Sequence, residues 1–117
     1  MELKDFLEKQ DKLDKYIVDN QIKSGNMKQI HHNSNMFLGD RLHALMVEVS
    51  ELSNATRCFK YWSTKEPETK ERILDELADV IHFLASVINT LRFTAKETEE
   101  AYHKKYKENI RRQEEGY

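Results

Sequence analysis

Two pairs of acidic residues are the part of this sequence whose residue types and spacing could do chemistry. Glu48 and Glu51 form an E-x-x-E pair, and Glu76 and Asp79 form an E-x-x-D pair further along the chain. A spacing of three residues places both carboxylates of a pair on one face of a helix. Two such helices packed side by side would direct four carboxylates at one point, where like charges raise one another's pKa. The sequence therefore predicts a metal site shared by these four acids.

The donor set indicates which metal such a site would hold. Carboxylate oxygens favour a hard cation, and the sequence contains neither a cysteine cluster nor an H-x-x-x-H motif of the kind that binds zinc. Mg²⁺ is the first expectation, with Mn²⁺ or Ca²⁺ behind it. Magnesium bound by carboxylates keeps positions for water and for phosphate oxygens, so phosphate chemistry is the expected use.

The first half of the chain is expected to form two helices joined by a long connection. Apolar residues recur at helical spacing over residues 2–20, and Asp40 is a good N-cap for a helix that carries the first acidic pair. Residues 21–39 contain the adjacent pair His31 and His32 and suit a long connection with a single helical turn. This connection is a candidate for closing over a substrate.

Two capping-box patterns predict the remaining helices. Ser63-x-x-Glu66 predicts a third helix over about residues 67–92, which is the most apolar segment and carries the second acidic pair. Thr94-x-x-Glu97 predicts a fourth, strongly charged helix that ends near Gln113. With three glycines, one proline and no alternating strand pattern, the chain is predicted to be an all-α four-helix bundle that forms a single domain over residues 1–117.

Composition excludes several classes of function. A formal net charge of −2 disfavours binding to a nucleic acid polymer, although a local basic cluster could hold a small phosphate ligand. No apolar run is long enough to span a bilayer, so no membrane partner is expected. A single cysteine allows no intrachain disulfide, and the charged N-terminal residues lack a signal-peptide core, which indicates a cytoplasmic protein.

The segments around the acids resemble a known family, the all-α nucleoside triphosphate pyrophosphohydrolases, and within it the dimeric dUTP diphosphatase branch. The second helix and following turn of that branch are similar to residues 44–63, ALMVEVSELSNATRCFKYWS. Its metal and base segment is similar to residues 76–83, ELADVIHF, and its C-terminal phosphate-contacting segment to residues 105–117. Near the N-terminus, Gln10-x-x-Leu13-Asp14 resembles an element that reads uracil in relatives.

This resemblance implies Mg²⁺-dependent hydrolysis of dUTP to dUMP and pyrophosphate by a homodimer or homotetramer. The four acids would hold the metal, and Glu48 or Glu51 would also orient or deprotonate the attacking water. Trp62 and Phe83 are candidate aromatic walls for the base, because base stacking on aromatic side chains is favourable. The full set of expected substrate-binding residues is Gln10, Asp14, Lys60, Trp62, Phe83, Lys105, Asn109 and Arg112.

Three alternatives remain open from sequence. The MazG-type members of the same superfamily share the acids and accept other bases such as that of dCTP, so the acids alone do not fix the substrate. Asp79-x-x-His82 and Glu100-x-x-His103 weakly resemble the ligands of di-iron carboxylate bundles. A helical interaction module with no activity, in which the acids only solvate the surface, is the third alternative and predicts no stabilisation by Mg²⁺.

Overall fold

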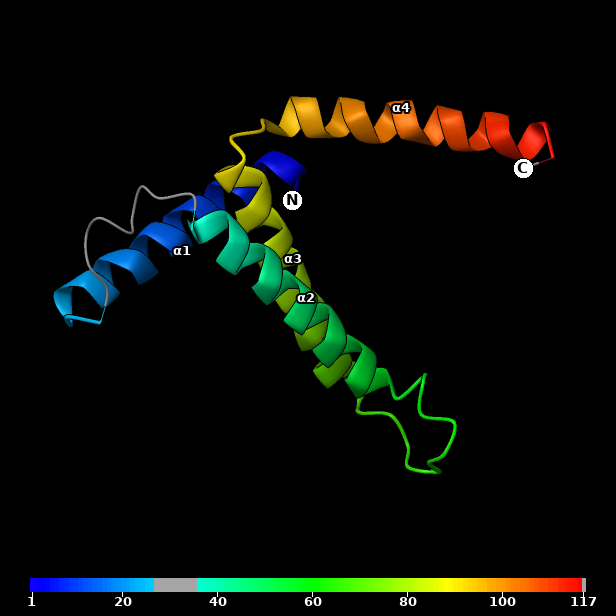
Figure 1. The fold of residues 1–117 in the computed structure, drawn as a ribbon, viewed down its shortest axis with the longest axis horizontal. Coiled ribbons are helices and arrows are strands. Elements are labelled where there is room, and N and C mark those ends of the chain that lie inside the picture. Colours follow the sequence, from blue (N-terminus) through cyan, green and yellow to red (C-terminus); the bar gives the residue numbers. More distant parts are fainter. Residues whose placement is uncertain (27–35, 117) are drawn as a thin grey trace.

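The computed structural model describes residues 1–26 and 36–116, and within these residues the chain forms four helices and no strand (Figure 1). The helices are α1 (Leu3–Lys23), α2 (Met36–Thr56), α3 (Lys70–Thr90) and α4 (Ala95–Glu114). The predicted all-α fold is confirmed. None of the described helices is long and apolar enough to cross a membrane. The histidine pair expected in the long connection, His31 and His32, lies outside the described residues.

α2 and α3 lie side by side and run in opposite directions, and α1 crosses them near one end (Figure 1). At that end Arg41 Nη1 donates a 2.7 Å hydrogen bond to Thr90 Oγ1 and joins the start of α2 to the end of α3. At the other end the Glu68 backbone N–H donates to the Ala55 carbonyl over 2.9 Å. The two bonds fix the register, so the middle of α2 faces the first half of α3.

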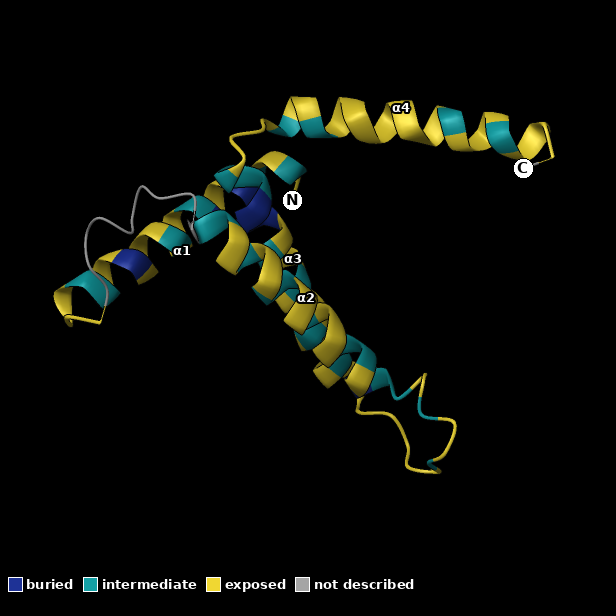
Figure 2. Cartoon of the chain, viewed as in Figure 1, coloured by how far each residue is buried: buried dark blue, intermediate teal, exposed yellow. Residues whose placement is uncertain are grey.

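The buried core is small and is centred where α1 crosses α3 (Figure 2). Its apolar members are Leu7, Val18, Ala55, Ala85 and Val87. Large apolar side chains elsewhere stay exposed, including a run on α3 whose members are 37% to 51% exposed. We call this run the α3 apolar stripe, because its spacings of three, four and seven place it on one helix face; it consists of Leu74, Leu77, Ile81, Leu84 and Leu91.

The start of α2 differs from the prediction. The helix begins at Met36, so Asp40 lies inside it and is not the N-cap. One turn before the expected start, the Phe37 ring lies under the Arg41 guanidinium, with 4.8 Å between Arg41 Cζ and the ring centroid. This contact between residues four apart stabilises an additional helical turn. Gly39 is accommodated within that turn although glycine disfavours helix interiors.

The start of α3 also differs. Thr69 is the N-cap, its Oγ1 accepting a 3.3 Å hydrogen bond from the Arg72 backbone N–H, so the helix begins at Lys70 and not near Pro67. Ser63 does not form the predicted capping box. Its hydroxyl instead accepts hydrogen bonds from Arg57 Nη2 at 2.8 Å and from the Lys65 backbone N–H at 3.2 Å, which stabilise the connection between α2 and α3.

α4 begins as predicted but does not pack onto the other helices along its length. Thr94 and Glu97 form the expected capping box, in which each side chain accepts the other's backbone N–H. No residue of α4 is buried, and the helix extends away from α2 and α3 (Figures 1 and 2). α4 ends at Glu114, one residue after the predicted end, while α1 runs to Lys23 and not to Asn20.

Candidate active site

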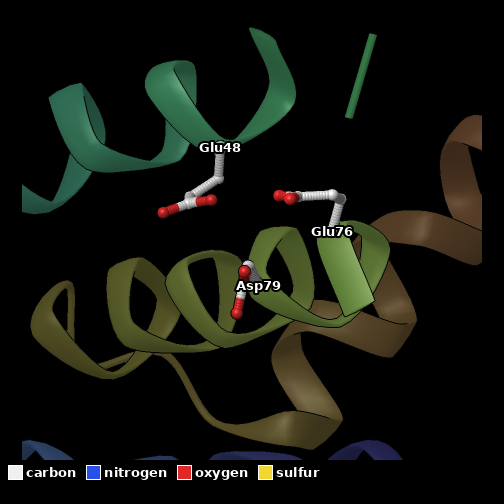
Figure 3. A group of neighbouring side chains, drawn as sticks. All are labelled: Glu48, Glu76 and Asp79. Atoms are coloured by element: carbon white, nitrogen blue, oxygen red, sulfur yellow. The ribbon is translucent and has the colours of Figure 1, made fainter. Parts of the chain in front are cut away.

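The antiparallel register of α2 and α3 brings three of the four predicted acids together. Glu48 projects from α2 toward Glu76 and Asp79 of α3 (Figure 3). One carboxylate oxygen from each residue lies within 4.8 Å of those of the other two. We call these three residues the acid cluster. Glu76 and Asp79 reach it from one helix because a spacing of three residues puts them on the same face.

The acid cluster is electrostatically strained. Oε2 of Glu48 and Oε2 of Glu76 are both buried and have no hydrogen-bond partner. Burial raises the pKa of Glu48, and the hydrogen bond and charge of Glu51 together with the charges of Asp79 and Glu76 raise it further. A buried acceptor without a partner is costly, and the cost is larger when the group carries charge. A cation would satisfy both orphan oxygens and remove the mutual repulsion.

The chemistry of the donors fits a hard divalent cation. All three residues offer oxygen ligands, and no histidine or cysteine joins a cluster of this kind within residues 1–26 and 36–116. Mg²⁺, Mn²⁺ and Ca²⁺ prefer such oxygen donors, and Mg²⁺ sites built from few carboxylates retain water in the remaining positions. The acid cluster is therefore suited to a metal that also binds phosphate oxygens.

Glu51 lies beside this group but outside it. Its side chain is exposed and forms a hydrogen bond with Glu48, whereas the converging oxygens come from Glu48, Glu76 and Asp79. The carboxyl group of Glu51 is thus next to a member of the acid cluster and open to solvent. That position suits a group that contacts a water molecule more than it suits a fourth ligand of the metal.

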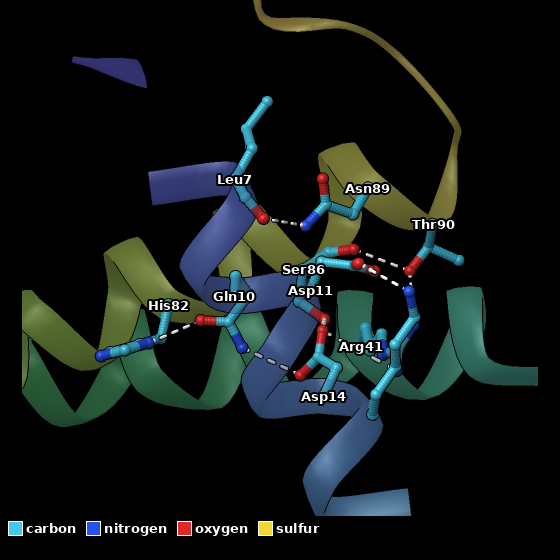
Figure 4. A network of polar contacts seen from close by, with 10 residues as sticks. Leu7, Gln10, Asp11, Asp14, Arg41, His82, Ser86, Asn89 and Thr90 are labelled. Carbon is cyan, nitrogen blue, oxygen red and sulfur yellow. Dashed lines mark hydrogen bonds and ion pairs between the residues drawn. The ribbon is translucent and has the colours of Figure 1, made fainter. Parts of the chain in front are cut away.

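A polar network one to two helical turns further along α3 involves the predicted residues Gln10 and Asp14 (Figure 4). Gln10 is 5% exposed; its Nε2 donates to Asp14 Oδ1 at 2.9 Å, and its Oε1 lies 2.6 Å from His82 Nδ1. Asp14 Oδ2 accepts a 2.7 Å hydrogen bond from the hydroxyl of Ser86. The same oxygen lies 3.8 Å from Arg41 Nη2. We call these five residues the Asp14 network.

A cavity of about 230 Å³ adjoins this network. Lys9, Gln10 and His82 are its polar lining residues, and the apolar ones include Phe6, Ala78 and Ile81. A mostly apolar cavity with a few placed polar groups is the usual form of a small-molecule site. The partly used amide of Gln10 therefore borders a space with room for a planar ring.

The two aromatic residues expected at the base occupy different environments. Phe83 is half-buried on α3, one turn beyond Asp79. Trp62 is 64% exposed in the connection between α2 and α3, where its ring makes edge contacts with Phe59 and Tyr61. Lys60 Nζ lies 5.7 Å from the Phe59 ring centroid in the same connection. Within this chain, Phe83 lies on α3, the helix that carries two of the acids. Trp62 and Lys60 lie in the connection that precedes α3.

The three expected phosphate-binding residues of α4 are not brought to the acid cluster within one chain. Lys105, Asn109 and Arg112 follow one side of α4 at spacings of four and three, and α4 extends away from α2 and α3 (Figure 1). Arg112 Nε is 3.3 Å from Glu108 Oε1. These side chains reach the acid cluster of α2 and α3 only if α4 moves or if another chain supplies its α4.

Sequence reasoning missed Arg41 and Ser86 and considered His82 as a ligand only in the di-iron alternative. A usable signal was present, because His82, Ser86 and Asn89 form a polar row at spacings of four and three along the apolar third helix. Gln10 and Asp14 form a second polar pair at a spacing of four on the first helix. Two polar rows on otherwise apolar helix faces predict that those faces meet.

An all-α fold in which two antiparallel helices present clustered carboxylates to a hard cation defines a class of phosphate-handling hydrolases. The dUTPase family model matches residues 2–98, which cover α1 to α3 and the start of α4. The chain therefore belongs to the all-α dUTPase family and is a hydrolase that acts on phosphoric anhydrides. No curated protein and no solved structure matches the chain.

Family membership excludes one of the alternatives that the sequence left open. The interpretation as a helical module without activity is wrong, because the family consists of hydrolases. The di-iron interpretation has no support in the acid cluster. His82 Nδ1 contacts Gln10, and no histidine joins the acid cluster in the described part of the chain. Residues after position 98, including most of α4, lie outside the matched segment.

Proposed function

We propose that residues 1–117 form one domain that hydrolyses dUTP to dUMP and pyrophosphate with the help of Mg²⁺, in the cytoplasm. The observation that carries the proposal is the acid cluster, in which two buried carboxylate oxygens lack any partner. The family match to the dUTPases supplies the substrate class. Mn²⁺ has the same ligand preferences and is expected to substitute for Mg²⁺.

Glu48, Glu76 and Asp79 would hold the metal, with Glu51 able to join them. Bound there, the cation supplies neutralisation of phosphate charge and a lowered pKa for a nearby water. Glu51, which is exposed beside Glu48, would orient that water and take its proton. The water oxygen forms a bond to phosphorus, a phosphoanhydride bond breaks, and pyrophosphate leaves.

The base would be read by the Gln10 amide. Gln10 borders the cavity beside His82, and its hydrogen bonds to His82 and Asp14 leave one N–H and one oxygen lone pair unused. Those two groups match the N3–H and a carbonyl of uracil. Phe83 and Trp62 are the aromatic candidates for stacking, Phe83 from α3 and Trp62 from the exposed connection.

An oligomer would let the α4 residues contact the phosphate groups of the substrate. The α3 apolar stripe is exposed in the single chain, and five apolar residues are buried within the described part of the chain. A homodimer or homotetramer would cover that stripe, because apolar faces of this extent are normally buried in stable oligomers. α4 of one chain lying on α2 and α3 of another would bring Lys105, Asn109 and Arg112 to the triphosphate, with Lys60 as a further cationic donor.

The deciding experiment is to measure kcat/KM for dUTP, dCTP, dTTP and UTP in Mg²⁺ and to identify the released species. The expected result is the highest value for dUTP, pyrophosphate as direct product and no turnover after chelation. Comparable values for dCTP and dUTP would place the chain with the broad-specificity MazG-type enzymes. Inorganic phosphate as the direct product would contradict the proposed reaction. The metal site is tested separately by thermal unfolding, and a melting temperature that Mg²⁺ does not change would contradict it.

A further inference from the structure

The orientation of the Gln10 amide is determined by its neighbours. An amide can be turned by 180°, which exchanges its oxygen and nitrogen and so reverses the pattern it shows to a ligand. Gln10 lies 2.9 Å from Asp14 on one side and 2.6 Å from His82 on the other, and only 5% of the residue is exposed. A neighbour that can accept a hydrogen bond but cannot donate one therefore decides the orientation of the amide.

Asp14 is that neighbour. Its Oδ2 accepts the Ser86 hydroxyl hydrogen bond at 2.7 Å and lies 3.8 Å from Arg41 Nη2, so both neighbours of that oxygen are donors and the carboxylate acts as an acceptor. An ionised carboxylate is acceptor-only. Asp14 Oδ1 therefore requires the Nε2 amino group of Gln10 to face it, as the 2.9 Å contact has it.

His82 completes the arrangement. With Nε2 directed at Asp14, the Gln10 oxygen faces His82 Nδ1 at 2.6 Å and can only accept. The hydrogen must then be on His82 Nδ1, which fixes the tautomer of a neutral imidazole. Carboxylate, amide and imidazole thus form one chain of hydrogen bonds with a single consistent direction (Figure 4).

We infer that Asp14 does not contact the substrate and is the positioning residue that selects uracil over cytosine by fixing the direction of the Gln10 amide. The inference deepens the proposed function and rests on it for the identity of the base. Uracil presents a ring N–H beside a carbonyl, and cytosine presents a bare ring nitrogen beside an amino group. The same Gln10 edge pairs with one base in one orientation and with the other base when turned.

Asp14→Asn should reverse the whole chain of hydrogen bonds. The Arg41 guanidinium favours the Asn oxygen at the Oδ2 position, which leaves the Asn amino group facing Gln10. The Gln10 oxygen must then turn to accept it, and its amino group turns to His82. His82 Nδ1 becomes the acceptor, and its hydrogen moves to Nε2. The substitution preserves shape, so it changes the hydrogen-bond direction with little change in packing.

The test combines kinetics with histidine NMR on the full-length protein. The ratio of kcat/KM for dUTP to that for dCTP should fall by about 10- to 100-fold in Asp14→Asn, because each mismatched buried hydrogen bond is costly. Long-range ¹H–¹⁵N correlation at alkaline pH should show His82 protonated at Nδ1 in the wild type and at Nε2 in the variant, with the signal assigned through His82→Phe. Asp11→Asn is the matched control, because Asp11 pairs with exposed Lys15 on the same helix and should leave both readouts unchanged.

Each contrary result has a separate meaning. A wild-type His82 protonated at Nε2 would overturn the hydrogen-bond chain whatever the substrate is, and this measurement needs no variant. A tautomer change in Asp14→Asn with an unchanged dUTP to dCTP ratio would overturn the role in specificity, as would an equal loss of activity on both nucleotides. A wild-type enzyme without dUTP preference would refute the proposed function and the specificity role, while the tautomer would still report on the network.

Discussion

Replacing Glu76 with glutamine should make the protein more stable without metal and inactive with it. The substitution removes one charge from the acid cluster while keeping the side chain's size. Two unit charges 4.8 Å apart repel by about 3.5 kcal/mol at an effective dielectric constant of about 20. Solvent screening at the exposed Asp79 reduces the recoverable part to about 1–2 kcal/mol.

A gain of that size is measurable by thermal unfolding. For a chain of this length, 1 kcal/mol shifts Tm by about 3–6 °C. Glu76→Gln should therefore melt about 3–12 °C above the wild type in EDTA, at equal protein concentration since an oligomer's Tm depends on it. In saturating Mg²⁺ the order should reverse, because only the wild type gains binding free energy, about 2.7 kcal/mol at 100 times Kd.

The matched control is Glu99→Gln, which removes an exposed glutamate of α4 and should change neither Tm nor turnover appreciably. The reasoning would be refuted if Glu76→Gln melted at or below the wild type in EDTA, since the acid cluster would then not be repulsive. It would also fail if the variant kept near wild-type dUTP turnover in Mg²⁺, since Glu76 would then not be a metal ligand.

Four further outcomes are expected. In metal-free buffer, stability should fall as pH rises above 4.5, the ordinary value for Glu48, because the folded protein holds that proton more tightly than the unfolded chain does; urea unfolding across pH should show the fall, and Glu48→Gln should flatten it. The Arg111 hydrogen bond lowers the pKa of Glu108 to about 2, so α4 helicity by circular dichroism should decline as pH drops from 4.5 toward 2, and a constant signal would contradict this. Leu84→Lys should give a particle near 14.0 kDa by light scattering where the wild type is larger, and equal sizes would argue against the α3 apolar stripe as the interface. Lys105→Ala should raise KM for dUTP about 10-fold with little change in kcat, and an unchanged KM would remove Lys105 from the site.

The acids were predictable because a spacing of three fixes a helix face regardless of tertiary context. Glu76 and Asp79 were certain to share a side of α3, and Glu48 and Glu51 a side of α2. What the spacing did not determine was the register between the helices. The bonds from Arg41 to Thr90 and from Glu68 to Ala55 set that register, and they place Glu48 between the two α3 acids while Glu51 stays exposed.

The helix starts show where local patterns compete. Thr94 was correctly predicted as the N-cap of α4, because its capping-box partner Glu97 is within hydrogen-bond reach. Within the described part of the chain, no other residue forms a hydrogen bond with either side chain. Ser63 carries the same pattern, but Arg57 and the Lys65 N–H take its hydroxyl, and Thr69 caps the helix instead. At α2, the contact between Phe37 and Arg41 outweighs the capping preference of Asp40.

The polar rows predict that the faces of α1 and α3 meet, but the individual contacts of the Asp14 network could not be paired from sequence, because the central ones join residues 72 positions apart. Its position nevertheless constrains function. Glu76, Asp79, His82 and Ser86 all project from α3, where each residue adds about 1.5 Å of rise. On α3, the metal ligands are thus separated from His82 and Ser86 by about one to two turns of one rigid helix. A substrate whose phosphates lie at the acid cluster therefore has its base placed by the same element, so a change in the packing of α1 on α3 would alter base selection without moving the metal site.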